Sequence, residues 1–323
     1  MIDFEDVAAA ARRIAPHAHE TPVFTCRALS DLADAELFFK CENFQRVGAF
    51  KFRGAVNAVL SLGEDEARPG VATHSSGNHA QAVALAARIR GVTAHIVMPE
   101  NAPAVKVAAV RDYGGTITFC EPTLASREST LREVVAETGA AVVHPYDDDR
   151  VIAGQGTAAL ELLGQVDGLD VVCAPVGGGG LISGTAITVK ALLPEARVVA
   201  AEPEAADDAF RSMKAGRIVP SVDPQTISDG LRTSLGQRNF AIMRAHDVEV
   251  VTVSEAETAR ALRLVLERMK LLIEPSSAVP VAAALAGRLS RGARKARIGI
   301  ILTGGNVDIE RLGAILEANE GSR

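Results

Sequence analysis

Apolar and polar positions along the chain follow two alternating patterns. Short runs rich in Val, Ile and Ala alternate with longer Ala- and Leu-rich segments of helical spacing. The short runs predict strands at residues 37–42, 71–75, 93–98, 116–120, 141–144, 171–176, 197–201 and 297–302. The longer segments include predicted helices at residues 78–90, 105–111, 127–137 and 181–193. Because the strands are apolar along their length, we expect an α/β fold with mostly parallel sheets covered by helices on both faces.

Length and composition narrow this picture. At 323 residues the chain is long enough for two α/β lobes, or for one large domain with an insertion. The net charge is −6, and the one basic cluster, at 288–297, is typical of a solvated helix end, so we expect no nucleic-acid partner. The acidic N-terminus and the lack of a long uncharged apolar run predict a cytoplasmic protein without a membrane segment.

A lysine in an apolar setting is the first chemical candidate. Lys51 lies between Phe50 and Phe52, in a segment that follows the predicted strand 37–42. Partial removal from water lowers the pKa of an amine and makes it nucleophilic. A helix end whose lysine extends into solvent explains the same pattern. The segment by itself leaves both interpretations open.

Four consecutive glycines follow the predicted strand 171–176 and precede the predicted helix 181–193; they are Gly177, Gly178, Gly179 and Gly180. Their backbone N–H groups are uncovered, and the helix N-terminus behind them adds partial positive charge, so the loop is suited to a phosphate group. The spacing is that of neither a dinucleotide fingerprint nor a P-loop. A tight turn is the alternative, but it requires fewer glycines.

Polar residues gather at another strand-to-helix junction. Ser75, Ser76, Asn78 and His79 combine hydroxyl and amide groups with the free N–H groups of a helix start, a set suited to a carboxylate. A Ser or Asn helix cap is the alternative.

A threonine followed by two glycines ends the last predicted strand. The hydroxyl of Thr303 can hydrogen-bond a ring nitrogen without supplying charge. An ordinary glycine-rich turn explains this segment equally well on its own.

In this order, the segments resemble the fold-type II pyridoxal phosphate (PLP) enzymes, the tryptophan synthase β-subunit superfamily. Within it, the chain is most similar to the serine racemase and serine/threonine dehydratase branch, over residues 21–308. The motifs that carry the resemblance are FKFRGA at 50–55, SSGNH at 75–79, HP at 144–145, AGQGT at 153–157, the four glycines, LIEP at 272–275 and GGN at 304–306. The resemblance implies two three-layer lobes: a large PLP-binding domain, residues 1–69 and 148–323, and a small mobile domain, residues 70–147.

The resemblance also implies a cofactor site. Lys51 would form the Schiff base with PLP, and Phe50 would lie beside the cofactor ring. Asn78 would bind the 3-hydroxyl group, the four glycines the phosphate, and Thr303 the pyridine nitrogen.

For the substrate, the resemblance implies that Ser75, Ser76, Asn78 and His79 surround the α-carboxylate. Arg127 is similar to a substrate-pocket arginine of the racemases. In racemases a hydroxyl at the place of Ser76 faces the side of the cofactor opposite the lysine. Because racemisation needs an acid or base on each face of Cα, Lys51 and Ser76 would be the two catalytic groups.

An acidic segment resembles the metal site of related racemases. There two carboxylates and a carbonyl, which correspond to Glu202, Asp208 and Ala206, bind Mg²⁺ or Ca²⁺, and Mn²⁺ would fit the same oxygen ligands. A solvated acidic loop is the alternative.

The implied activity is α,β-elimination of L-serine or L-threonine to a 2-oxo acid and ammonia, together with serine racemisation. Ammonia-lyase activity on threo-3-hydroxyaspartate is the alternative within the family. The resemblance further implies a homodimer and an ATP or AMP effector. From other classes, a Rossmann-type oxidoreductase would need the absent GxGxxG motif, and a silent amino-acid-binding module would lack Lys51.

Overall fold

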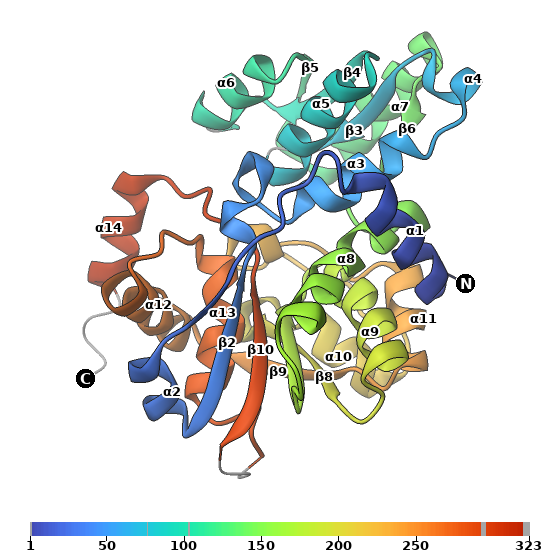
Figure 1. The fold of residues 1–323 in the computed structure, drawn as a ribbon. Coiled ribbons are helices and arrows are strands. Elements are labelled where there is room, and N and C mark those ends of the chain that lie inside the picture. The colour runs from blue at the N-terminus through green and yellow to red at the C-terminus, as the bar shows by residue number, and fades with distance from the viewer. Residues whose placement is uncertain (1, 76, 103, 292–294, 319–323) are drawn as a thin grey trace.

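The computed structural model describes residues 2–75, 77–102, 104–291 and 295–318, and these residues form two sheets (Figure 1). The six-stranded sheet has the order β1-β2-β10-β7-β8-β9, and only the pair β1–β2 is antiparallel. Its strands are β1 (Val23–Thr25), β2 (Ala35–Cys41), β7 (Val171–Pro175), β8 (Arg197–Pro203), β9 (Glu249–Val253) and β10 (Ala296–Leu302). The four-stranded sheet is parallel, with the order β5-β4-β3-β6. Its strands are β3 (Val71–His74), β4 (Ala94–Pro99), β5 (Gly115–Cys120) and β6 (Ala141–Val142).

We call each sheet with its helices a lobe. The large lobe contains the six-stranded sheet and the helices α1 (Phe4–Ile14), α2 (Arg27–Ala33), α8 (Asp149–Gln165), α9 (Gly180–Leu192), α10 (Asp208–Ala215), α11 (Gln237–Ala245), α12 (Glu255–Leu264), α13 (Pro275–Leu285) and α14 (Ile309–Ala318). The small lobe contains the four-stranded sheet and α4 (Glu64–Ala67), α5 (Asn78–Arg90), α6 (Ala104–Asp112) and α7 (Leu124–Thr138). Helix α3 (Lys51–Leu60) lies between the lobes (Figure 1). Short helical turns are η1 (Glu42–Phe44), η2 (Arg46–Gly48), η3 (Glu204–Ala206), η4 (Asp229–Leu231) and the π-helical η5 (Val265–Met269).

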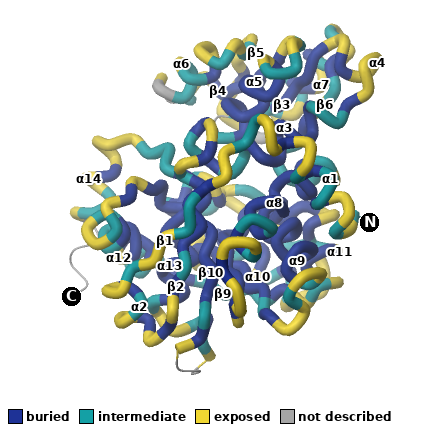
Figure 2. Tube along the Cα trace, viewed as in Figure 1, coloured by how far each residue is buried: buried dark blue, intermediate teal, exposed yellow. Residues whose placement is uncertain are grey.

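The large-lobe sheet is buried on both faces, as its apolar strands require. In β7, Val171 and Cys173 pack toward α12 and α13, whereas Val172 and Ala174 pack toward α8 and α9. Successive side chains of a strand point to opposite faces, so a strand between two helix layers has to be apolar throughout. Figure 2 shows this buried centre in dark blue beneath exposed helix surfaces.

Helix α3 joins the two lobes through its packing. One face of the small sheet is covered by α3 and α5, and the other by α7. The same α3 packs against α8 of the large lobe. Because Lys51 is the first residue of α3, the fold places its side chain where the lobes meet.

The predicted elements are present, with small differences at their ends. The helix predicted at 78–90 is α5, with the same bounds. The strand predicted at 141–144 ends at Val142, because the His144 ring accepts hydrogen bonds from the next backbone N–H groups and turns the chain. The sequence pattern did not indicate β1 and β9, which lie at the sheet edges and lack a continuous apolar run. In the described part of the chain, no helix is long and apolar enough to cross a membrane.

Candidate active site

The motif loops meet because they leave parallel strands at the same ends. Neighbouring strands β2, β10 and β7 lead into the lysine segment, the Thr303 loop and the glycine loop. In open α/β sheets, ligands bind beyond the carboxyl ends of the strands. The loop after β3, which begins with Ser75, approaches from the small lobe, because Asn78 hydrogen-bonds to Asn306 in the large lobe.

Lys51 is half-buried at the start of α3. Its Nζ donates a hydrogen bond to the carbonyl oxygen of Pro145 at 2.7 Å and is 5.2 Å from the centroid of the Phe50 ring. Burial lowers the pKa of Lys51 to about 8, while the nearby Glu274 carboxylate opposes this change. About half of the amine is therefore unprotonated at pH 8, as nucleophilic or general-base chemistry requires.

The four glycines form a buried loop with unused donors. Among the described residues, none of the N–H groups of the glycine loop, residues 177–180, has a hydrogen-bond acceptor, although all four glycines are buried. The Gly178 carbonyl is held by the backbone N–H of Gly236 and by Nδ2 of Asn239. Since buried N–H groups are nearly always paired, this loop fits the phosphate of PLP.

Close packing explains why the loop consists of glycine. A Cβ atom on Gly178 would lie 2.2 Å from Cγ of Tyr146. Gly179 has a φ of +97°, and a Cβ there would lie 2.7 Å from Cβ of Asn239. Larger residues would displace the loop or its neighbours.

Thr303 lies in a neutral hydroxyl network. Its Oγ1 is 2.9 Å from Oγ of Ser277, which also hydrogen-bonds the backbone of Gly304. The Thr303 carbonyl accepts the N–H of Phe50 at 2.9 Å, which ties this loop to the lysine segment. An uncharged hydroxyl suits a pyridine nitrogen that stays unprotonated. Ser277 was missed in the sequence, although it follows the LIEP motif by two residues.

The small-lobe loop supplies free donors at the start of α5. Ser75 Oγ accepts the N–H of Gly77 at 3.2 Å, and within the described residues the N–H groups of Asn78 and His79 have no partner. Such a helix start suits a carboxylate. Ser76, expected here as a substrate ligand and second catalytic group, lies outside the described residues.

The His79 ring binds the protein rather than a charged ligand. Its Nε2 donates to the carbonyl of Val143 at 3.0 Å, and burial lowers its pKa well below the usual value. The ring is therefore neutral. Any bond from His79 to a substrate carboxylate would come from its backbone N–H.

Arg127 lies on α7 near this loop. Burial lowers the pKa of His74, the last residue of β3, and the positive charge of Arg127 lowers it further. The Arg127 side chain is half-buried, and its Nε is 3.4 Å from the Thr123 carbonyl.

Glu274 and Asn306, to which the sequence assigned no role, hydrogen-bond to Asn78 in the candidate cofactor site. Glu274 is 5% exposed and accepts hydrogen bonds from Nδ2 of Asn78 at 3.0 and 3.3 Å. Nδ2 of Asn306 donates to Oδ1 of Asn78 at 2.9 Å. The motif match indicated both residues, but their contact with Asn78 depends on how the lobes meet.

The expected metal ligands form a separate buried group. Glu202, at the end of β8, accepts the N–H groups of Ala209 and Phe210. Asp208 accepts the N–H of Leu235 at 2.8 Å. Burial raises the pKa of Glu202 to about 9 and that of Asp208 to about 6. Ala206 is buried in η3, between them in sequence. Among the described residues, no group of three or more His, Cys, Asp or Glu side chains is placed to hold a metal ion.

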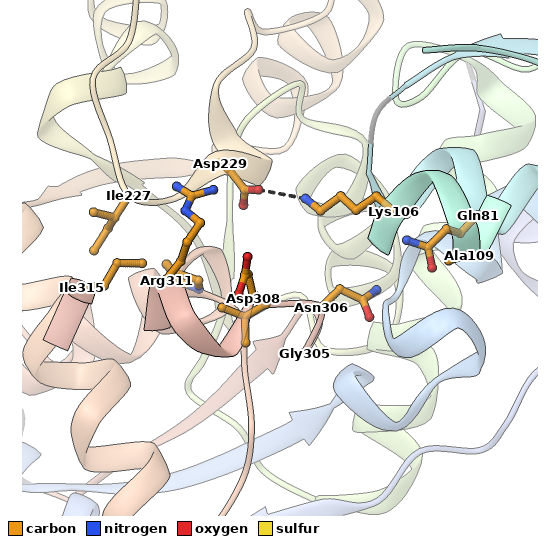
Figure 3. A pocket seen from close by; sticks show the side chains of 12 residues that line it. Gln81, Lys106, Ala109, Ile227, Asp229, Gly305, Asn306, Asp308, Arg311 and Ile315 are labelled. Carbon is orange, nitrogen blue, oxygen red and sulfur yellow. Dashed lines mark hydrogen bonds and ion pairs between the residues drawn. The ribbon is translucent and has the colours of Figure 1, made fainter. Parts of the chain in front are cut away.

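A cavity of about 200 Å³ opens between the lobes beside Asn306 (Figure 3). Lys106 on α6 reaches across it, and its Nζ is 3.0 Å from Oδ2 of Asp229 in η4. Asp308 and Arg311 line the large-lobe side. Lys106 is also near the small-lobe loop, because a Cβ on Gly77 would be 4.0 Å from its Nζ.

Known proteins match most of this chain. A family model described as pyridoxal-phosphate dependent enzyme matches residues 14–304. The β-hydroxyaspartate dehydratase of Paracoccus denitrificans is 52% identical over 309 residues, which cover 96% of this chain and 98% of that protein. The structure of serine racemase from Dictyostelium discoideum has a TM-score of 0.92 and 47% identity, covering 95% of this chain and 99% of its own. The structure of a threonine deaminase from T.th. has a TM-score of 0.90 and 46% identity, with the same coverage. These matches confirm the resemblance and the fold class inferred from the motifs.

Proposed function

We propose that this chain, which belongs to the family of pyridoxal-phosphate dependent enzymes, removes water from a β-hydroxy-α-amino acid such as L-serine or L-threonine. Loss of water would leave an enamine, and hydrolysis of the released enamine would return one water and give a 2-oxo acid and ammonia. One observation carries the proposal: Lys51, whose pKa is about 8, and a buried loop whose four N–H groups have no acceptor among the described residues follow strands on either side of the strand that leads to Thr303. The family match over residues 14–304 favours this assignment over the oxidoreductase and the silent binding module.

Each residue of the site has a separate role in this proposed reaction. When bound, PLP supplies an electron sink that stabilises negative charge on the substrate's Cα. The glycine loop would hold the phosphate through its N–H groups, and Thr303 would provide a neutral partner for the ring nitrogen. Lys51 would anchor the cofactor through its amine and would act as the general base that takes the proton from Cα. The Pro145 carbonyl is within reach of that amine and orients it.

Racemisation extends this proposal. A second acid or base on the opposite face of Cα would allow the proton to be returned there. Ser76 is the candidate, on the sequence argument alone. D-serine formed from L-serine, measured alongside 2-oxo acid release, reports this activity directly.

threo-3-Hydroxyaspartate is a second candidate substrate, and the charge around the small-lobe loop favours it. Both Lys106 and Arg127 lie near this loop, although the α-carboxylate of serine requires only one set of donors. A substrate with a second carboxylate has a use for the additional cation. The relative from Paracoccus denitrificans is named for activity on β-hydroxyaspartate.

We also propose that Glu202, Asp208 and the Ala206 carbonyl bind a divalent cation such as Mg²⁺, Ca²⁺ or Mn²⁺. Two buried carboxylates whose pKa values are raised gain from a cation between them. Homodimer formation, an ATP or AMP effector, cytoplasmic location and movement of residues 70–147 as a small domain stay predictions.

The test is a 2-oxo acid assay on L-serine, L-threonine, D-serine and threo-3-hydroxyaspartate. The wild-type protein should absorb visible light as a PLP Schiff base and convert at least one L-substrate. Lys51→Ala should lose that absorbance and reduce turnover by at least about 10³-fold. Lys214→Ala, which removes an exposed lysine on α10, is the matched control and should behave as wild type. Normal absorbance and turnover in Lys51→Ala would refute the proposal.

A further inference from the structure

Both ends of the Asn78 side-chain amide hydrogen-bond to residues of the other lobe. It is the first residue of α5 in the small lobe, whereas Glu274 precedes α13 and Asn306 follows β10 in the large lobe. Glu274 accepts from its amide nitrogen, and Asn306 donates to its amide oxygen. Both polar ends of the Asn78 side chain are thus fixed by groups across the lobe boundary.

The orientation of these amides follows from which groups can only accept. Nδ2 of Asn306 is 2.6 Å from the carbonyl oxygen of Val47, and a carbonyl oxygen cannot donate. Asn306 must therefore present its NH₂ group to Val47, and the same NH₂ group faces Oδ1 of Asn78. The amide nitrogen of Asn78 is then turned toward the Glu274 carboxylate.

The Asn306 side chain packs against an unusual turn at Val47. Val47 has a φ of +56°, which is strained for a β-branched residue, and the following Gly48 also has a positive φ. The Asn306 side chain lies against this turn, since a Cβ on Gly48 would be 2.8 Å from its Oδ1. The turn leads directly into Lys51, so Asn306 connects the lysine segment with Asn78.

The charge of Glu274 strengthens its hydrogen bond with the Asn78 amide nitrogen. Burial raises the pKa of Glu274 to about 7, and the negative charge of Asp229 also raises it. The hydrogen bond from Asn78 and the positive charges of Lys106 and Lys51 lower it. At the slightly alkaline pH where Lys51 is also available, Glu274 is mostly ionised. An ionised carboxylate accepts but never donates, so it excludes the flipped Asn78 amide.

We propose that Glu274 and Asn306 are positioning residues that hold the Asn78 amide with a donor N–H directed at the cofactor site. The amide nitrogen carries two hydrogens, and Glu274 requires one of them. The second is directed at the acceptor that PLP would present, its 3-oxygen. The same contacts hold the small lobe against the large lobe beside the cofactor. This inference rests on the proposed function, because it assumes that PLP binds beside Lys51.

A double-mutant cycle on cofactor affinity tests it without any turnover. PLP is titrated into apoenzyme and followed by visible absorbance for wild type, Glu274→Gln, Asn306→Ala, Asn78→Ala and the paired variants. Glu274→Gln and Asn306→Ala should each weaken PLP binding about tenfold, as expected for loss of a buried hydrogen bond to a charged or fixed partner. In the Asn78→Ala background, Glu274→Gln should change affinity less than twofold, because the group it positions is gone.

Controls separate positioning from general damage. Glu310→Gln removes an exposed carboxylate at the start of α14 and should leave PLP affinity unchanged. Thermal unfolding of each apoenzyme checks folding, and Glu274→Asp, which keeps the charge, should restore part of the affinity if Glu274→Gln unfolds easily.

Two outcomes overturn the inference. A further tenfold loss from Glu274→Gln in the Asn78→Ala background would mean that Glu274 acts independently of Asn78. Equal affinities for wild type and Glu274→Gln would mean that it does not act on the cofactor site. A wild-type apoenzyme that fails to bind PLP would refute the proposed function as well, so the two failures are distinguishable.

Discussion

The glycine loop and the small-lobe loop, residues 75–79, approach the same site but are held in different ways. The glycine loop is buried, and added Cβ atoms would collide with Tyr146 and Asn239 and crowd Leu231. In the small-lobe loop, Ser75, Gly77 and Asn78 are only partly buried, and Asn78 is held by contacts across the lobe boundary. The difference indicates a fixed cradle for the cofactor phosphate and a small-lobe side, carrying Asn78 and the substrate donors, whose position depends on how the lobes meet.

The largest expected difference between the two loops is the effect of one added methyl group on PLP affinity. In Gly178→Ala, the new Cβ would lie 2.2 Å from the Tyr146 ring, so the loop or the ring must move. We expect PLP affinity to fall at least about 100-fold, in line with a cost of roughly 3 kcal/mol for overpacking. In Gly77→Ala, the nearest atom is the flexible Lys106 Nζ at 4.0 Å, and affinity should change less than about fivefold.

PLP titration of both apoenzymes measures this difference. Gly63→Ala, where nothing lies within 4 Å of the added Cβ, is the control for the substitution itself. Equal losses in Gly77→Ala and Gly178→Ala would contradict the view that only the glycine loop is tightly packed.

This contrast also explains what the sequence reveals. A run of four glycines after a strand is a local signal, and the fold class and the match around Lys51 follow from local patterns of the same kind. The groups that make the glycine loop rigid come from distant segments: Tyr146 from the connection before α8, and Asn239 from α11. Nothing in their local sequence marks them, because their role is created by packing between segments.

The contacts that hold the small-lobe loop also could not be predicted from its local sequence. Asn78 was identified, but the orientation of its amide depends on Asn306, 228 positions away, and on a positive φ at Val47. A valine in that conformation contradicts its local preference, so only the assembled structure can maintain it. The Lys106–Asp229 pair, 123 positions apart, joins the lobes by another such contact.

The cation site should support the glycine loop from behind. Asp208 binds the N–H of Leu235, and the next residue, Gly236, donates to the Gly178 carbonyl. Burial raises the pKa of Glu202 from 4.5 to about 9, so without a cation the folded state binds a proton that the unfolded state loses above pH 4.5. This contribution to stability is complete below pH 4.5 and is lost as the pH rises toward 9.

We therefore expect Mg²⁺ to stabilise the protein more at pH 8.5 than at pH 6. Protein freed of cations with EDTA should unfold at lower temperature as the pH rises. At a concentration 100 times its Kd, Mg²⁺ should raise Tm by about 5 °C at pH 8.5. Differential scanning fluorimetry measures both effects. Glu202→Gln should remove the response to Mg²⁺, and an undiminished response in that variant would show that the cation binds elsewhere.

The smallest expected effect is at the edge of the small-lobe loop. The Lys106–Asp229 pair is partly exposed, with side chains 21% and 35% accessible, so its loss should cost no more than about 1 kcal/mol. If the pair holds the lobes together, Lys106→Met and Asp229→Asn should raise the KM for L-serine by a similar factor of about five, and PLP affinity should stay within twofold of wild type.

Steady-state kinetics on L-serine and threo-3-hydroxyaspartate separate this role from direct substrate recognition. Lys106→Met should then impair the dicarboxylic substrate more than serine, whereas Asp229→Asn, which frees the ammonium group, should not. A fall in PLP affinity in either variant would mean that this pair, like the contacts of Asn78 with Glu274 and Asn306, also supports the cofactor site.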